Sequence, residues 1–294
     1  MNKVTIEEAL QGASFCLQEA GIEQPRKEAE YLLSRIMKKD RLQLFLRREE
    51  FISPEVEAVF KEAVRRRCRY EPAAYIDGEK YFYGKSFIVN QEVLIPRPET
   101  ELIVDCALEW SGWLESRHSK PVSCVDLGTG SGALAVTLAL QLPDLKIWAV
   151  DLSAAALKVA GLNAIEHGVK ERICLLKGNY FDAFDQVEIK PNFNLVVSNP
   201  PYLGKEELES LPVGVKNYEP VKALDGGADG LDGYRCILAR LGEFIEAPAV
   251  LLMEVGAGQK DKVEALCSDT GLFSSINWRS DLNGWPRVIE GCIC

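Results

Sequence analysis

Beyond about residue 97, short apolar segments alternate with longer segments that have helical periodicity. Strands are predicted at residues 124–127, 147–150, 173–176, 193–197, 250–253, 274–278 and 288–289, with helices at 133–141 and 153–167 between the earlier of them. Such alternation is typical of a mostly parallel β-sheet that is covered by helices on both faces and binds its ligands at the carboxyl ends of the strands. We therefore predict an α/β fold for residues 97–294.

The first part of the chain is helical instead. Capping residues, or a proline in the first turn, indicate helix starts at Thr5, Pro25, Asp40 and Ser53. In the fourth of these helices the residues expected to face inward are Val56, Val59, Phe60, Ala63 and Val64. We expect residues 1–75 to form a small helical bundle. Residues 76–96, which alternate around Gly84, are expected to form a β-hairpin that links the two parts.

A glycine-rich segment, DLGTGSGA at residues 126–133, follows the first predicted strand. Glycines at the start of a helix allow a tight turn and let a ligand approach the backbone closely. Asp151 ends the second predicted strand, where its carboxylate can accept hydrogen bonds from both hydroxyls of a ribose. These features indicate a nucleoside site, and they fit nicotinamide cofactors as well as S-adenosylmethionine.

The fourth predicted strand ends in Asn199-Pro200-Pro201-Tyr202, which is more specific. An amide or aromatic amine nitrogen is a poor nucleophile because its lone pair is delocalised. If the Asn199 side-chain carbonyl and the Pro200 backbone carbonyl each accept one N–H, the nitrogen is held in place for methyl transfer. Proline fixes the backbone, and the Tyr202 ring can stack on a flat substrate group. The tetrapeptide therefore predicts a methyltransferase acting on a planar NH2 group.

Composition limits the remaining possibilities. No apolar run reaches the roughly 18 residues of a membrane helix, and the N-terminus does not resemble a signal peptide, so we expect a cytoplasmic protein. The nine cysteines are never spaced as C-x-x-C and there are only two histidines, so we expect reduced thiols and no metal. The formal net charge of −10 argues against a nucleic-acid backbone as main partner. The basic cluster at residues 65–69 fits a helix end, or else a contact with RNA or a partner.

Several motifs together resemble the PrmC/HemK family of peptide chain release factor N5-glutamine methyltransferases. They are DLGTGSG at 126–132, NPPY at 199–202, IPRPETE at 95–101, YEP at 218–220 with ALDGGADG at 223–230, and MEVG at 253–256. The resemblance covers nearly the whole chain. It implies a Rossmann-like S-adenosylmethionine-dependent methyltransferase domain that carries a small N-terminal helical domain.

The resemblance also implies roles for particular residues. Those expected at S-adenosylmethionine are Gly128, Thr129, Gly130, Ser131 and Gly132 at its methionine part, Asp151 at the ribose, Tyr180 near the adenine, and Asn199. Those expected to hold the glutamine of a Gly-Gly-Gln tripeptide are Asn199, Pro200, Pro201 and Tyr202, of which Asn199, Pro200 and Tyr202 are the catalytic candidates. The segments that could close over the site or line its substrate side are 97–101, 219–220 and 225–230.

Class 1 peptide chain release factors are the implied partners, docked by the helical domain, and S-adenosylhomocysteine is the implied product. We expect a monomer that does not bind nucleic acid directly. Two alternatives stay open. An adenine-N6 DNA or RNA methyltransferase would share NPPY but would need a basic groove and a target-recognition domain. A nonenzymatic nucleoside-binding module would be favoured by a damaged NPPY motif or by the absence of Asp151. In this sequence the NPPY motif is intact and Asp151 is present.

Overall fold

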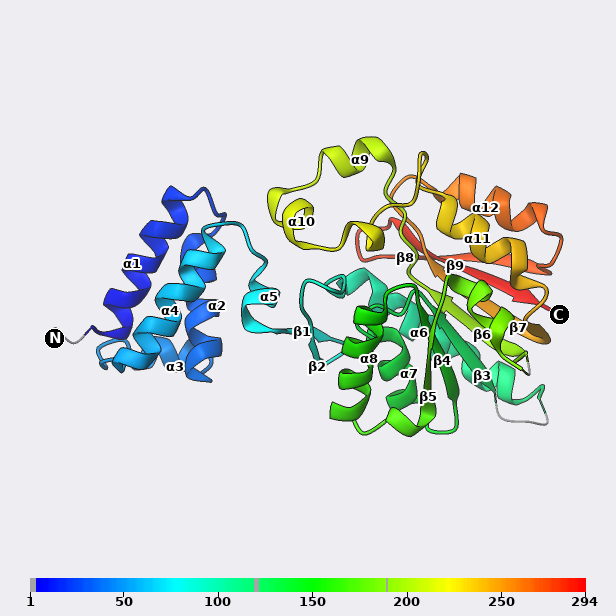
Figure 1. Ribbon diagram of the computed structural model, residues 1–294, viewed down its shortest axis with the longest axis horizontal. Helices are drawn as coiled ribbons and strands as arrows, with labels where there is room; N and C mark the ends of the chain where they lie inside the picture. The colour runs from blue at the N-terminus through cyan, green and yellow to red at the C-terminus, as the bar shows by residue number, and fades with distance from the viewer. Residues whose placement is uncertain (1–3, 119–121, 189) are drawn as a thin grey trace. The chain divides into compact units, whose positions relative to one another are not determined.

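The computed structural model describes residues 4–118, 122–188 and 190–294, which form two compact units (Figure 1). One unit contains the N-terminal residues as far as Glu79 together with residues 212–218. The other contains residues 80–211 and 219–294. The expected division into 1–75, 76–96 and 97–294 is contiguous, whereas the structure groups a segment distant in sequence with the N-terminal helices.

The N-terminal unit is helical. Its helices are α1 (Ile6–Glu19), α2 (Pro25–Met37), α3 (Arg41–Leu46), α4 (Pro54–Arg67), α5 (Ala73–Asp77) and α10 (Val213–Tyr218). Thr5, Asp40 and Ser53 cap α1, α3 and α4, because the side chain of each accepts a hydrogen bond from the backbone N–H three residues later. Such a cap typically stabilises a helix by about 1 kcal/mol. The predicted helix starts are confirmed.

The core of this unit lies among α1, α2 and α4. Its buried residues include Ile6, Leu10 and Leu17 of α1, Leu32 and Leu33 of α2, and Phe60 and Val64 of α4. The expectation that Val59 also packs inward is wrong, since 55% of its surface is exposed. Val59 lies at the edge of the apolar stripe of α4, which is only as wide as the neighbouring helices can cover.

Helix α10 belongs to this unit through contacts with the loop after α4. The Tyr218 hydroxyl donates a hydrogen bond to the Arg69 carbonyl oxygen at 3.0 Å. A Cβ atom at Gly214 would lie 2.7 Å from the Tyr70 carbonyl oxygen, so glycine permits this close approach. Neither contact could be expected from local sequence, because about 150 residues separate the partners.

A two-stranded hairpin, β1 (Glu79–Phe82) and β2 (Lys85–Ile88), follows the helices. Its two-residue turn, Tyr83-Gly84, has positive φ at both positions (48° and 71°), as tight hairpins require. The hairpin is shorter than the expected span of 76–96, because regular pairing ends at Ile88.

The larger unit is built on a seven-stranded sheet with the order β5-β4-β3-β6-β7-β9-β8. Its strands are β3 (Ser123–Leu127), β4 (Lys146–Asp151), β5 (Ile173–Lys177), β6 (Phe193–Ser198), β7 (Ile245–Glu254), β8 (Ser275–Ser280) and β9 (Pro286–Ile293). Neighbours from β5 through β7 are parallel, and β9 runs antiparallel to β7 and β8. The predicted mostly parallel α/β fold is confirmed.

Helices cover both faces of the sheet (Figure 1). On one face α6 (Glu101–Glu115), α7 (Ala133–Gln141) and α8 (Ala154–Glu166) pack against the strands, and on the other α11 (Asp232–Leu241) and α12 (Lys260–Asp269) do so. Alternate residues of β6 divide between the two cores: Leu195 and Val197 face α6 and α7, whereas Val196 faces α11. Because both faces of the sheet are buried, the sequences of the strands are continuous apolar runs.

Shorter elements complete this unit. They are α9 (Lys205–Glu209) and the 3₁₀ turns η1 (Pro98–Thr100), η2 (Lys170–Arg172), η3 (Tyr180–Gln186) and η4 (Val221–Ala223). The chain runs from β3 outward through β4 to β5, then returns to β6 on the other side of β3. The carboxyl ends of β3 and β6 therefore form the point of strand-order reversal, where ligands bind in sheets of this kind.

Candidate active site

The glycine-rich loop and the NPPY turn begin side by side at this reversal point. Leu127 and Ser198, the last residues of β3 and β6, are paired in parallel register, and the Ser198 hydroxyl donates a hydrogen bond to the Leu127 carbonyl oxygen at 2.6 Å. Gly128 and Asn199 follow directly on the two strands. The fold thus brings together two motifs that are 71 residues apart in sequence.

The glycine-rich loop needs its glycines for two different reasons. Gly128, Gly130 and Gly132 all have positive φ, at 80°, 56° and 80°. At Gly132 a Cβ atom would lie 3.0 Å from the Cβ of Ala160, so α8 leaves no room for a side chain. At Gly130 a Cβ would meet no described atom within 4 Å, so this part of the loop faces open space. A ligand could therefore approach the backbone there.

Asp126 lies beneath this loop and is fully buried. Its Oδ2 accepts hydrogen bonds from the Thr129 hydroxyl at 2.6 Å and from the Ala135 backbone N–H at 3.2 Å. Its Oδ1 has no hydrogen-bond partner within the described ranges. Burial raises the pKa of this carboxyl to about 7, despite the two hydrogen bonds that lower it. A buried oxygen without a donor is costly unless a ligand or water supplies one.

Asp151, at the end of β4, holds the other side of the loop. Its Oδ2 accepts from the Gly130 N–H at 2.8 Å, and its Oδ1 accepts from the Ser153 N–H at 2.8 Å. Burial raises the pKa of Asp151 above its usual value. Since each carboxylate oxygen has two lone pairs, both oxygens can still accept a further hydrogen bond from a ribose hydroxyl.

Tyr180, the first residue of η3, extends from the glycine-rich loop towards α11. Its ring carbon Cε1 lies 3.9 Å from the point where a Cβ of Gly128 would be, and its hydroxyl lies 3.0 Å from the corresponding point at Gly233. A Cβ at Gly233 would also lie 2.9 Å from the Cβ of Pro200. Tyr180 therefore lies within reach of both predicted motifs. Its φ of 47° is in the left-handed region, which a non-glycine residue seldom adopts.

The side chain of Asn199 is held by a hydrogen-bonded chain. Its Nδ2 donates to the Thr100 hydroxyl at 3.0 Å, and that hydroxyl donates to Glu254 Oε2 at 2.5 Å. The Tyr202 hydroxyl donates to the other carboxylate oxygen, Oε1, at 3.4 Å. Neither Asn199 Oδ1 nor the Pro200 carbonyl oxygen accepts a hydrogen bond from any residue that the structure describes. These are the two acceptors expected to face the substrate.

The NPPY turn is supported from behind by the predicted glycine-rich segment 225–230. A Cβ at Gly226 would lie 2.9 Å from the Pro201 carbonyl oxygen, and one at Gly230 would clash with the Tyr202 carbonyl oxygen. Gln259 Nε2 donates to the Tyr202 carbonyl oxygen at 2.8 Å. The segment packs directly against the backbone of the turn, so it is more than a surface loop.

The two other segments expected near the site contact each other. Arg97 Nη2 lies 2.7 Å from Glu219 Oε1, and the Ile95 N–H donates to Glu219 Oε2 at 3.3 Å. Glu219 is almost completely buried. This ion pair fixes residues 95–97, and with them the start of the turn that carries Thr100.

Sequence reasoning assigned no role to Asn163, on α8, or to Glu254. Asn163 is fully buried and exchanges two hydrogen bonds with the backbone of Ile88, while its Nδ2 also donates to the Ser131 carbonyl oxygen at 2.8 Å. It thereby ties the hairpin to the glycine-rich loop. A polar residue within an apolar helical pattern was the available signal for Asn163, and the MEVG motif was the signal for Glu254.

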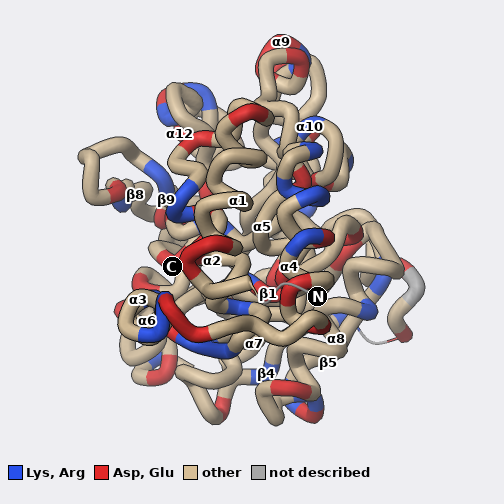
Figure 2. Tube along the Cα trace, turned by 90° about the vertical axis from the view of Figure 1, so that its left-hand side faces the viewer, with Lys and Arg blue, Asp and Glu red and all other residues tan. Residues whose placement is uncertain are grey.

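The basic cluster at residues 65–69 is largely neutralised within the N-terminal unit. Arg65, Arg66 and Arg67 form ion pairs with Glu62, Glu71 and Glu28 at 2.5–2.7 Å. Figure 2 shows basic and acidic positions interspersed along the chain rather than gathered in a one-signed stripe. These contacts favour a structural role for the cluster over nucleic-acid binding.

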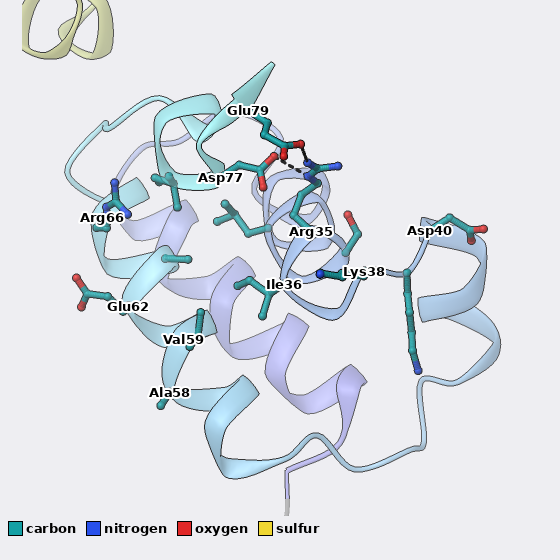
Figure 3. Close-up of a pocket in the computed structure, with 15 residues that line it drawn as sticks. Arg35, Ile36, Lys38, Asp40, Ala58, Val59, Glu62, Arg66, Asp77 and Glu79 are labelled. Carbon is teal, nitrogen blue, oxygen red and sulfur yellow. Dashed lines mark hydrogen bonds and ion pairs between the residues drawn. The ribbon is translucent and has the colours of Figure 1, made fainter. Parts of the chain in front are cut away.

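The N-terminal unit also has a hollow of about 1100 Å³ between α2, α4 and α5 (Figure 3). Ile36 and Val59 line it together with charged side chains, including Arg35, which is paired with Asp77 and Glu79. The hollow contains none of the predicted site residues. Its mixed apolar and charged lining is suited to protein contact.

Among the described residues no group of three or more His, Cys, Asp or Glu side chains could hold a metal ion. No helix within the described ranges is long and apolar enough to cross a membrane.

Two segments of the chain match known protein families. Residues 8–78 match the family model of the PrmC N-terminal domain, and residues 113–211 match that of the methyltransferase small domain. The N-terminal domain of human METTL16, solved in complex with SAH, has a TM-score of 0.53 at 15% identity and covers 92% of this chain and 94% of that one. That similarity shows the fold alone. The matched methyltransferase small domain defines the class of this protein as methyltransferase.

Relatives along the whole chain are more specific. The release factor glutamine methyltransferase of Geobacter sulfurreducens is 39% identical over 98% of this chain and 97% of its own length. That of Koribacter versatilis is 37% identical over 98% of both chains. The chain belongs to the release factor glutamine methyltransferase family.

Proposed function

We propose that this protein transfers a methyl group from S-adenosylmethionine to the side-chain amide nitrogen (N5) of the glutamine in the Gly-Gly-Gln tripeptide of class 1 peptide chain release factors. The observation that carries the proposal is the arrangement at Asn199. Its NH2 group is committed to Thr100, and its oxygen and the Pro200 carbonyl oxygen accept no hydrogen bond from the described residues.

Asn199 and Pro200 would act by orientation. Each carbonyl oxygen accepts one N–H of the substrate amide, so that the nitrogen is held at two points and its rotation is prevented. The carbonyl dipoles also stabilise the positive charge that grows on nitrogen as the new N–C bond forms. The Tyr202 ring packs against the flat amide. We expect the proton to leave to water after the transfer, since no described group at Asn199 is placed as a general base.

The glycine-rich loop fits S-adenosylmethionine on the evidence of its own atoms. Asp126 Oδ1 lacks a donor, the backbone at Gly130 faces open space, and Asp151 retains acceptor capacity. We assign the methionine part of the ligand to residues 128–132, the ribose to Asp151 and the adenine to the neighbourhood of Tyr180, with Asn199 adjoining the methyl group. When bound, S-adenosylmethionine supplies a methyl group on a positively charged sulfur, and S-adenosylhomocysteine is the product. We propose no metal.

For the helical unit we propose docking of the release factor body, so that an extended tripeptide loop can reach Asn199. The hollow lined by Ile36 and Val59 offers apolar contact area, and the paired charges around it offer partners for a polar rim. We propose a cytoplasmic monomer that does not bind nucleic acid directly.

An adenine-N6 methyltransferase would share the NPPY chemistry but would need a basic groove for its nucleic acid. In this protein the arginines of α4 are ion-paired with glutamates, so they do not form such a groove. The proposal is tested by incubating the protein with methyl-labelled S-adenosylmethionine and a release factor, its Gln→Ala variant at the tripeptide, or duplex DNA. Label on the intact glutamine alone, located by mass spectrometry, supports it. Label on adenine, or on no substrate, contradicts it.

A further inference from the structure

A chain of three polar side chains joins parts of the site that are far apart in sequence. Thr100 follows the IPRPE segment, Asn199 follows β6 and Glu254 ends β7. The links are Asn199 Nδ2 to Thr100 Oγ1 at 3.0 Å and Thr100 Oγ1 to Glu254 Oε2 at 2.5 Å. Thr100 and Glu254 are both buried, so water does not compete strongly for these bonds.

The direction of the hydrogen bonds follows from the chemistry of the three groups. An ionised carboxylate only accepts, so the single hydroxyl hydrogen of Thr100 points to Glu254. The hydroxyl oxygen can then only accept from its other neighbour, and of the two ends of the Asn199 amide only the NH2 end donates. The amide oxygen must face the opposite way. Without this constraint the two ends of an amide side chain have nearly the same shape and could exchange.

We propose that Thr100 and Glu254 are positioning residues that hold the Asn199 amide with its oxygen towards the substrate and so make the site select a primary amide over a carboxylate of the same shape. This inference rests on the proposed function. A glutamine side chain brings N–H donors to the Asn199 oxygen, whereas a glutamate side chain would place a second acceptor against it. Leaving buried acceptors opposed in this way disfavours binding, typically by tenfold or more.

The rate of methyl transfer should then depend on pH through the ionisation of Glu254. Burial raises the pKa of Glu254 to about 7; Glu99 raises it further, whereas Thr100, Tyr202 and Arg287 lower it. The hydroxyl of Tyr234 donates a hydrogen bond to the backbone carbonyl oxygen of Glu254 at 3.2 Å, so its interaction with the carboxyl group is only electrostatic and acts over a longer distance. When Glu254 is protonated it can donate to Thr100, and the direction of the chain is no longer imposed. Methyl transfer should therefore rise with pH through the region around 7.

Three variants test the role of the Thr100 hydroxyl. Thr100→Val keeps the shape and removes the hydroxyl, Thr100→Ser keeps the hydroxyl, and Thr137→Val is a matched control, because Thr137 is also buried and its hydroxyl has no partner in the described ranges. With a Gly-Gly-Gln peptide we expect Thr100→Val to lower kcat about tenfold or more, with S-adenosylmethionine affinity retained. Thr100→Ser should restore kcat, and Thr137→Val should match the wild type. We also expect the wild type to bind a Gly-Gly-Gln peptide more tightly than a Gly-Gly-Glu peptide in competition. Of the three variants, only Thr100→Val should show a smaller difference between the two affinities.

The pH profile supplies a second test that does not depend on the stability of Thr100→Val. Glu254→Gln should lose the rise in kcat around pH 7, whereas Glu290→Gln, at another buried glutamate, should keep it. If Thr100→Val matches Thr137→Val in kcat, or Glu254→Gln keeps the rise, the inference is overturned while the proposed function stands. If the wild type methylates no glutamine peptide or release factor, the proposed function fails and the inference with it.

Discussion

The Ser198 hydroxyl donates a hydrogen bond to the carbonyl oxygen of Leu127 at 2.6 Å and thereby joins the last residues of β6 and β3. Both residues are fully buried. The bond sets the relative height of the two strand ends, and so the distance between the loop proposed to bind the methyl donor and the turn proposed to bind the amide.

Replacing Ser198 by alanine should loosen this junction. Loss of the donor leaves a buried carbonyl oxygen short of a partner, which costs about 1–3 kcal/mol of unfolding free energy. The control is Ser111→Ala, because the Ser111 hydroxyl bonds a carbonyl within its own helix. Urea unfolding should show the larger loss for Ser198→Ala. Equal losses in the two variants would contradict the role given to this hydrogen bond.

The glycines of the loop should differ in their tolerance of alanine. Gly132→Ala meets both the left-handed φ of this position and the close approach of Ala160, whereas Gly130→Ala meets only the backbone strain, about 1 kcal/mol. We expect Gly132→Ala to lower the unfolding free energy clearly more than Gly130→Ala.

The same substitution in an ordinary helix is the control for these two variants. Gly12 lies within α1, has no described atom within 4 Å of a Cβ, and should gain about 0.5–1 kcal/mol from alanine. A Gly132→Ala protein as stable as Gly130→Ala would show that contact with α8 does not constrain the loop.

Neutralising Asp151 should weaken binding of S-adenosylmethionine. Asp151→Asn removes a charged acceptor from the loop and from the proposed ribose contact, and hydrogen bonds to charged groups contribute about 1.5–3 kcal/mol. On that basis we expect the Kd for S-adenosylmethionine to rise roughly tenfold to hundredfold. Calorimetric titration measures it, with the exposed Asp182 as the matched Asp→Asn control. An unchanged Kd in Asp151→Asn would exclude the ribose role.

The stability contributed by Asp126 should depend on pH. Burial raises the pKa of this group to about 7 in the folded state, against a usual value of 3.8, so the folded protein binds more protons than the unfolded chain between these values. Stability linked to Asp126 therefore falls as pH rises from about 4 to about 7. Relative to Asp126→Asn, the wild type should lose unfolding free energy between pH 5 and pH 7.5. A constant difference between the two proteins would contradict this assignment.

Features of the fold that depend on neighbouring residues could be predicted from the sequence, whereas features that depend on distant residues could not. Helix starts at Thr5, Asp40 and Ser53 follow from a side chain and a backbone N–H three residues away, so they were predicted correctly. The strands and their mostly parallel arrangement followed from apolar runs alternating with helices. The extension of β7 back to Ile245 did not, because it passes through Pro248, which argues against a strand.

The support of the site lies in contacts between residues far apart in the chain. Thr100 and Glu254 are separated by 154 positions, and no local pattern shows that a threonine hydroxyl will meet a particular carboxylate. The grouping of α10 with the N-terminal helices is equally nonlocal. Sequence therefore predicted Asn199 as a site residue, whereas the hydrogen bonds that link it to Thr100 and Glu254 became evident only in the folded protein.

Docking by the helical unit makes a separate prediction about substrate size. Val59→Ser removes an exposed apolar side chain from the hollow, and loss of an apolar interface contact of this size typically weakens binding by about 1 kcal/mol, or roughly fivefold. KM should rise for an intact release factor and stay unchanged for a Gly-Gly-Gln peptide. Ile165→Ser, at an exposed aliphatic residue of α8, is the control. If Val59→Ser and Ile165→Ser have the same KM for the intact release factor, the hollow is excluded as the docking surface.

The most direct test of the central claim is the single-turnover rate of methyl transfer to a release factor by Asn199→Ala, measured together with its affinity for S-adenosylmethionine. If Asn199 holds the substrate amide, the rate should fall about a hundredfold or more, as when a group that stabilises a transition state is removed, while Kd for S-adenosylmethionine changes by only a few-fold. A rate within a few-fold of the wild type would contradict the account, because the amide would then be held by other groups.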